Sequence, residues 1–295
     1  MFIGELAAVG TACLWGYSTY MHTNAAKLMG AWPLILFRFP LVLFYNIVLA
    51  LLFGVSWEIP QASIPWLVAS GIMGLGVADT LLYQGCVRIG AKMGAILWQV
   101  TPCVTALIAF FLLGETLSIQ NMAGMLLIIL SVIYVIMQEQ HSGAQDVSPK
   151  EWRYGLILVT ISIFALAISH VCIRKGLSFG IDPLMASILR ICAALSATGL
   201  MVVLSGGQSA VFHKIIHAKG AIRIVLLASF FGTTIGNWMA VYSMQFAKAG
   251  IASTLMGLSP FAVIALSSLQ ERTLPSPKIL LGVICAVCGS ALLFV

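Results

Sequence analysis

The amino-acid sequence predicts an all-α integral membrane protein in which ten transmembrane helices form two inverted five-helix repeats. Three observations predict this fold class. The 295 residues are 61% hydrophobic and only 8% charged, apolar stretches recur at the length of a membrane span, and a series of short motifs occurs twice in the same order. A typical soluble domain, by contrast, has roughly 25% charged residues.

The composition favours one membrane domain. A helix needs about 20 apolar residues to cross the hydrocarbon core, and the mean hydropathy of the chain is +1.06. The first apolar stretch lacks a basic leading segment, contains Glu5 and exceeds the length of a signal-peptide core, so we interpret it as a span. All seven cysteines lie in apolar runs, which predicts free thiols without a disulfide framework.

Hydropathy along the chain predicts the positions of the spans. A polar segment near the middle, residues 139–152, is expected to link a first repeat (1–138) to a second repeat (153–295). The predicted spans are residues 3–22, 32–53, 66–87, 93–113, 120–138, 153–174, 183–204, 222–245, 250–269 and 278–295.

The basic residues are unevenly divided between the two ends of these spans. One end receives ten Lys and Arg residues and the other three; with Arg38 and Arg190 inside the spans, these account for all 15. The positive-inside rule places the basic end in the cytoplasm and both termini outside. The net charge of +6 thus reflects loops beside the membrane, and we expect no nucleic-acid partner.

Internal repetition indicates two similar halves. Residues 91–102 parallel residues 249–260, both ending in proline, and the Glu-Thr-Leu of 115–117 parallels the Glu-Arg-Thr-Leu of 271–274. Because each half holds five predicted spans, an odd number, the second copy enters the membrane with opposite polarity. Inverted repeats of this kind are typical of transporters that expose one site to either side in turn.

Through these motifs the sequence resembles the EamA-type branch of the drug/metabolite transporter (DMT) superfamily. Each half has an Arg early in its second span (Arg38, Arg190), a small-residue segment (90–95, 249–253) and a proline, then a Glu-containing turn (114–118, 271–274). In the second turn Gln270 replaces the usual Gly, and one extra residue follows the Glu.

The resemblance implies a secondary transporter of small organic metabolites, without an enzymatic activity or a cofactor, spanning a bacterial inner (plasma) membrane several times. It also implies a central cavity lined by the third, fourth, eighth and ninth helices, with the fifth and tenth at the rear. It places both termini in the cytoplasm, opposite to the charge count, so the orientation stays open.

Three charges inside the spans need an explanation, because an intramembrane charge costs roughly 2.5 to 3.5 kcal/mol on insertion scales. Arg38 and Asp79 are predicted about 9 and 12 Å from the same membrane face, which allows an ion pair. In the second half Arg190 is retained, but the position equivalent to Asp79 is Asn237. We hypothesise that Arg190, Asn237 and His170 form a cationic corner for a carboxylate or phosphate of the substrate.

Both charged positions have alternative interpretations. The alternative role for Arg190 is to cap backbone carbonyls or to extend to lipid headgroups. Asp79 is either a structural partner of Arg38 or a site for a coupling proton, since an isolated buried carboxylate takes up a proton and a paired one resists it.

Aromatic and amide side chains complete the predicted substrate site. Their spacing favours an amphipathic cage for an aromatic or cationic solute, with packing or an interfacial belt as the alternative. The further candidates are Trp15, Tyr83, Trp98, Gln99, Trp238 and Tyr242.

Other patterns do not indicate chemistry. Cys285 and Cys288 lie in an apolar span without His or acidic neighbours, and His213 and His217 are expected in a polar loop without a third ligand. No phosphate-binding loop or nucleophile elbow is present, so we expect neither an enzyme nor a metal site. The sequence therefore predicts a transporter of small organic metabolites, with amino acids and aromatic or cationic compounds as candidate substrates, and a channel or a lipid-handling protein as the alternatives.

Overall fold

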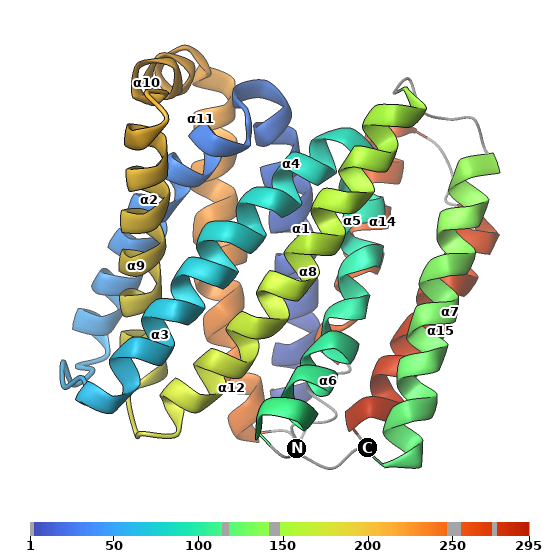
Figure 1. Cartoon of the computed structure of the whole chain (residues 1–295), viewed down its shortest axis with the longest axis horizontal. Coiled ribbons are helices and arrows are strands. Elements are labelled where there is room, and N and C mark those ends of the chain that lie inside the picture. Colours follow the sequence, from blue (N-terminus) through green and yellow to red (C-terminus); the bar gives the residue numbers. More distant parts are fainter. Residues whose placement is uncertain (1–2, 114–117, 142–147, 247–254, 273–275, 295) are drawn as a thin grey trace.

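The computed structural model of the chain describes residues 3–113, 118–141, 148–246, 255–272 and 276–294. Side chains are described throughout these ranges except at 112, 113, 139–141, 241, 242, 244–246, 271, 293 and 294. Within the described ranges every regular element is helical. The long helices run side by side as a bundle (Figure 1).

The first half begins with two long helices that are joined by a single residue. They are α1 (Ile3–Met29) and α2 (Ala31–Leu52), and Gly30 between them has a φ of 92°. Only glycine adopts this backbone conformation without strain. The remaining elements are η1 (Gln61–Ser63), α3 (Ile64–Ser70), η2 (Gly71–Ala78), α4 (Asp79–Ile89), α5 (Ala91–Leu97), η3 (Trp98–Val100), α6 (Thr101–Leu113) and α7 (Ile119–His141).

The second half begins with two capped helices. The side chain of Ser148 accepts a hydrogen bond from the backbone of Glu151 at the start of α8 (Pro149–Leu177), and Asp182 accepts one from Leu184 at the start of α9 (Pro183–Leu204). Such caps, followed by proline, define where a helix begins. The later elements are α10 (Gln208–His217), α11 (Lys219–Ala228), η4 (Ser229–Ile235), α12 (Gly236–Phe246), α14 (Ser259–Glu271) and α15 (Pro277–Phe294).

Several of these helices are suited to a membrane. Within the described residues, seven helical segments are long and apolar enough to cross it, and α14 and α15 are shorter apolar helices. The start of α1 and the end of α15 lie at the same end of the bundle, whereas α10 lies at the opposite end (Figure 1). The described part of the chain is thus all-helical, with the helix lengths of a multi-pass membrane protein.

Two helices depart clearly from the sequence prediction. α1 continues to Met29, seven residues beyond the predicted end at 22, because Ala25, Ala26 and Met29 are buried in a cluster with α2. Residues 208–217 form the helix α10, and the expectation of a polar loop for His213 and His217 is wrong. Ile215 packs against the same cluster, which stabilises a segment too short to be helical on its own.

The third span of each half contains a π-helical segment at the same position. η2 begins at Gly71 and η4 at Ser229, each 31 residues before the matched prolines Pro102 and Pro260. Each segment leads directly into the helix that carries Asp79 or Asn237. π-Helical turns are uncommon and often lie at functional sites. Their presence at the same position in both halves makes the region around Asp79 and Asn237 a candidate functional site.

The rear of the bundle is separate from this region. α7 and α15 pack side by side at one edge (Figure 1), the place that the family resemblance implies for the fifth and tenth helices. Gly282 and Gly289 of α15 allow this close packing against α7, as small residues do in membrane helices.

Candidate substrate-binding site

Arg38 and Asp79 form the predicted ion pair. Arg38 Nη2 lies 2.6 Å from Asp79 Oδ2, and the two side chains are only 6% and 9% exposed. Arg38 comes from α2 and Asp79 from the first turn of α4, directly after the π-helical segment η2. Removed from water, two opposite charges are tolerated because each compensates the other.

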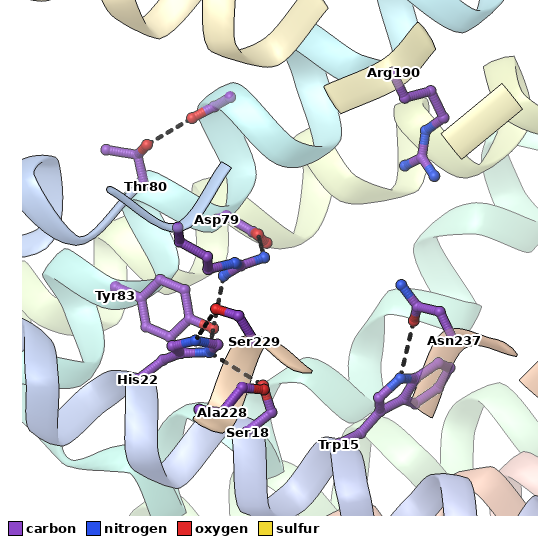
Figure 2. Close-up of polar contacts among 12 residues, drawn as sticks. Trp15, Ser18, His22, Asp79, Thr80, Tyr83, Arg190, Ala228, Ser229 and Asn237 are labelled. Carbon is purple, nitrogen blue, oxygen red and sulfur yellow. Dashed lines mark hydrogen bonds and ion pairs between the residues drawn. The ribbon is translucent and has the colours of Figure 1, made fainter. Parts of the chain in front are cut away.

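The ion pair continues into a buried hydrogen-bonded network. Arg38 Nη1 donates to the hydroxyl of Tyr83 at 3.1 Å, and that hydroxyl lies 3.4 Å from His22 Nδ1. His22 is fully buried and also contacts Ser18 at 3.1 Å and, through Nε2, Ser229 at 3.3 Å (Figure 2). The network therefore connects α1, α2 and α4 of the first half to η4 of the second.

His22 is not among the residues that the sequence assigned to the site. The signal available was a histidine four residues after a serine in an apolar helix, a spacing that brings both side chains to one face. Its partners Tyr83 and Ser229 lie far along the chain, so the spacing alone does not reveal them.

The two halves contact each other through equivalent hydrogen bonds. Ser18 of α1 donates to the carbonyl of Ala228 at 3.4 Å, and Ser169 of α8 donates to the carbonyl of Ser70 at 2.8 Å. Ser70 and Ala228 each lie 32 residues before the matched prolines. The first helix of each half thus binds the start of the π-helical segment in the other half.

Trp15 and Asn237 form a second link between the halves. The indole Nε1 of Trp15 donates to Asn237 Oδ1 at 3.0 Å (Figure 2). Gly236 makes room for this ring, because a Cβ at that position would lie 3.0 Å from Trp15 Cδ1. The structure therefore brings together two of the residues that the sequence singled out, on α1 and α12.

Arg190 contrasts with Arg38. Among the described residues its hydrogen bond is a long one, from Nη2 to Ser169 Oγ at 3.5 Å, and its Nε is buried without a partner. The charge of Arg190 interacts electrostatically with Asp79 and His170. Its guanidinium and the amide nitrogen of Asn237 point toward the same space (Figure 2).

The remaining predicted residues are more dispersed. Gln99 Nε2 donates to the carbonyl of Gly257 at 2.8 Å. Trp98 packs against the large cluster that reaches α7 and α15. Trp238 stacks on Phe53 at the end of α2, with ring centroids 5.4 Å apart. The side chain of Tyr242 lies outside the described residues.

The described residues offer no arrangement for a metal. No group of three or more His, Cys, Asp or Glu side chains among them is placed to hold an ion, and the seven cysteines are free. His213 and His217 stack on each other, with centroids 4.0 Å apart, on α10. What the site presents instead is one neutralised cation, one cation without a carboxylate, and hydrogen-bonding amide and indole groups.

Comparisons with known proteins agree with this architecture. The sequence pattern described as "EamA-like transporter family" matches residues 2–137 and again residues 153–295. No curated protein matches the chain. A solved structure described only as a crystal structure of a protein has a TM-score of 0.64 and 16% identity, covering 98% of this chain and 96% of its own. That identity supports a shared fold alone. The two matches together span nearly the whole sequence, and the chain therefore belongs to the EamA-like transporter family, a multi-pass membrane transporter of small molecules.

Proposed function

We propose that the protein is a secondary transporter that moves small organic metabolites by alternating access, without ATP hydrolysis. In this proposal ten transmembrane helices form two inverted repeats, residues 1–138 and 153–295. The 27-residue helix α1, added to the seven long and two short apolar helices, supplies the tenth span. The membrane is a bacterial inner (plasma) membrane, as the family resemblance implies.

The observation that carries the proposal is the equivalent contact between the halves. Ser18 binds the carbonyl of Ala228, and Ser169 binds the carbonyl of Ser70, at the start of the two π-helical segments. Two similar halves that meet through equivalent contacts can exchange their arrangements, which exposes one central site first to one side and then to the other.

We place the substrate between the halves, next to these contacts. The proposed substrate position is bordered by Trp15, Arg190, Asn237 and His170. Gln99 of η3 supplies a further amide. Arg38, Asp79 and Tyr83 hold the wall of the site through the buried ion pair and its hydrogen bond. We also assign to substrate binding, or to the support of the site, the residues Trp98, Trp238 and Tyr242.

Uptake into liposomes tests this function. Purified protein is reconstituted and presented with labelled amino acids, organic acids, nucleobases and quaternary amines, with and without a pH gradient, because a proton is a candidate coupling ion. Arg223→Gln, which removes an exposed cation on α11, is the matched control and should leave uptake unchanged.

Saturable uptake of one substrate class supports a carrier. Flux that rises linearly with concentration indicates a channel instead. Absence of flux for every solute, together with movement of labelled lipid, indicates a lipid-handling protein and contradicts the proposal.

A further inference from the structure

The three charges at membrane depth, Arg38, Asp79 and Arg190, do not balance. Arg38 and Asp79 neutralise each other at 2.6 Å, whereas Arg190 has no carboxylate within ion-pair distance among the described residues. Two cations and one anion leave a net charge of +1. Because a charge without a partner is costly at membrane depth, a single negative charge is the complement that this region lacks.

The repeat indicates where the missing charge belongs. Arg38 and Arg190 occupy equivalent places in α2 and α9, and Asp79 and Asn237 each lie 23 residues before the matched prolines. In the first half the carboxylate belongs to the chain itself. In the second half an amide of the same shape stands in its place and carries no charge.

Asn237 is oriented as a donor toward this place. An indole nitrogen can only donate, so the bond from Trp15 turns Asn237 Oδ1 toward Trp15. The two Nδ2 protons then face away, toward the side on which the Arg190 guanidinium lies (Figure 2). Asn237 is exposed, and Arg190 Nε has no hydrogen-bond partner among the described residues, so both residues keep donors that no described protein group satisfies.

We propose that Arg190 and Asn237 bind the carboxylate of a monoanionic organic acid, which occupies the position that Asp79 holds in the first half. This inference rests on the transport function proposed above and adds the substrate class. A guanidinium pairs with a carboxylate through two parallel hydrogen bonds, and Asn237 Nδ2 supplies a further donor. The ring of Trp15, held by Asn237, gives an apolar surface for the remainder of the solute.

Charge balance favours a carboxylate over a phosphate as the ligand of Arg190. A phosphate monoester carries a charge of about −1.5 to −2 at neutral pH, which would leave an uncompensated negative charge in the bundle. A monocarboxylate brings the sum of Arg38, Asp79, Arg190 and ligand to zero.

Binding and uptake by four variants test the inference. Purified wild-type protein and the variants Arg190→Gln, Arg190→Lys, Asn237→Asp and Arg223→Gln are mixed with an aromatic monocarboxylate or with its methyl ester, and the melting temperature is recorded. Uptake of the same acid is measured in liposomes. Loss of hydrogen bonds to a charged group is expected to reduce affinity about 10- to 100-fold.

We expect the acid, but not the ester, to raise the melting temperature of the wild type and of the Arg223→Gln control. Arg190→Gln should abolish this shift, and Arg190→Lys should weaken it, because an ammonium lacks the planar fork. Asn237→Asp is the most informative variant. Its new carboxylate should pair with Arg190, so that the protein stays folded with an unchanged or higher melting temperature but no longer responds to the acid.

The outcomes separate this inference from the transport function. Saturable uptake of neutral or cationic solutes, unchanged in Arg190→Gln, overturns the carboxylate site but leaves the carrier intact. Asn237→Asp protein that still binds the acid with wild-type affinity also overturns it. Absence of any saturable uptake contradicts the transport function itself.

Discussion

At the scale of single residues, the main feature is the buried hydrogen-bonded network around His22. Arg38, Asp79 and Tyr83 share hydrogen bonds within the first half, and His22 carries the network to Ser229 of the second. In a region of low dielectric, every partner in such a network is needed, since a buried polar group without a partner costs about 1 to 3 kcal/mol. The network therefore constrains how α1 and η4 lie against each other.

Replacement of Asp79 by Asn should destabilise the protein. It leaves the buried charge of Arg38 uncompensated, which costs about 3 to 5 kcal/mol. We expect lower yield and a lower melting temperature in detergent, and recovery in the double variant Arg38→Met/Asp79→Leu, which removes both charges. If Asp79→Asn instead keeps wild-type stability and loses only uptake driven by a pH gradient, Asp79 is a proton-coupling residue.

Replacement of His22 by Ala should remove the hydrogen bonds of its ring to Tyr83 and Ser229, and Tyr83 should keep its bond from Arg38. We expect a loss of stability of about 1 to 3 kcal/mol, measured as a fall in melting temperature. His22→Gln, which keeps polar atoms at the end of the side chain, should lose less. Equal losses for both variants would show that the volume of the ring, rather than its hydrogen bonds, is what matters.

At the element scale, the π-helical segments allow close approach between the halves. η2 packs against α8 and α9, and η4 packs against α1 and α2. Gly74 of η2 faces Ser169, and Gly232 of η4 faces Ser18, so that a Cβ at either position would collide with the serine. Small residues at both positions thus let the serine of one half reach the carbonyl of the other.

Replacement of Gly71 by Ala should disrupt this packing. A Cβ there would overlap the backbone carbonyl of Arg190, which cannot rotate away as a side chain can. We expect a loss of about 1 to 3 kcal/mol, together with weaker uptake because Arg190 is displaced. Gly199→Ala in α9 is the matched control, since nothing lies within 4 Å of its Cβ, and it should be neutral or stabilising by about 0.5 to 1 kcal/mol.

At the scale of the whole molecule, the bundle has one strongly basic end. α10 and the turn between α1 and α2 lie at that end, and the start of α1 and the end of α15 lie at the other (Figure 1). Exposed Phe212 and Ile216 of α10, with Lys214 between them, suit the boundary between lipid and water. The distribution of charge thus predicts an orientation of the protein in the membrane, and this orientation can be measured.

Reporter fusions test this orientation. From the excess of Lys and Arg at one end, the positive-inside rule predicts that both termini face outward. A phosphatase that is active only outside the cytoplasm should then be active when fused to the C-terminus, and a fluorescent protein that folds only inside should be dark. The reverse pattern would agree with the family resemblance and contradict the charge count.

Much of the fold follows from local properties of the sequence. Hydropathy located most of the long helices to within a few residues, because each helix must satisfy its own backbone hydrogen bonds in lipid. The ion pair of Arg38 and Asp79 was predictable since both charges lie at similar depth in neighbouring spans. Asn237 was identified as the counterpart of Asp79 by counting from the repeated prolines.

Contacts between distant segments were decided by the tertiary structure. Lateral packing in a membrane depends on shape and hydrogen bonds rather than on hydrophobicity, since lipid tails are as apolar as the helices. The sequence therefore established the helices, the two repeats and the depth of the charges. Only the packed bundle decided that His22 joins Tyr83 to Ser229, that Trp15 binds Asn237, and that Trp238 stacks on Phe53.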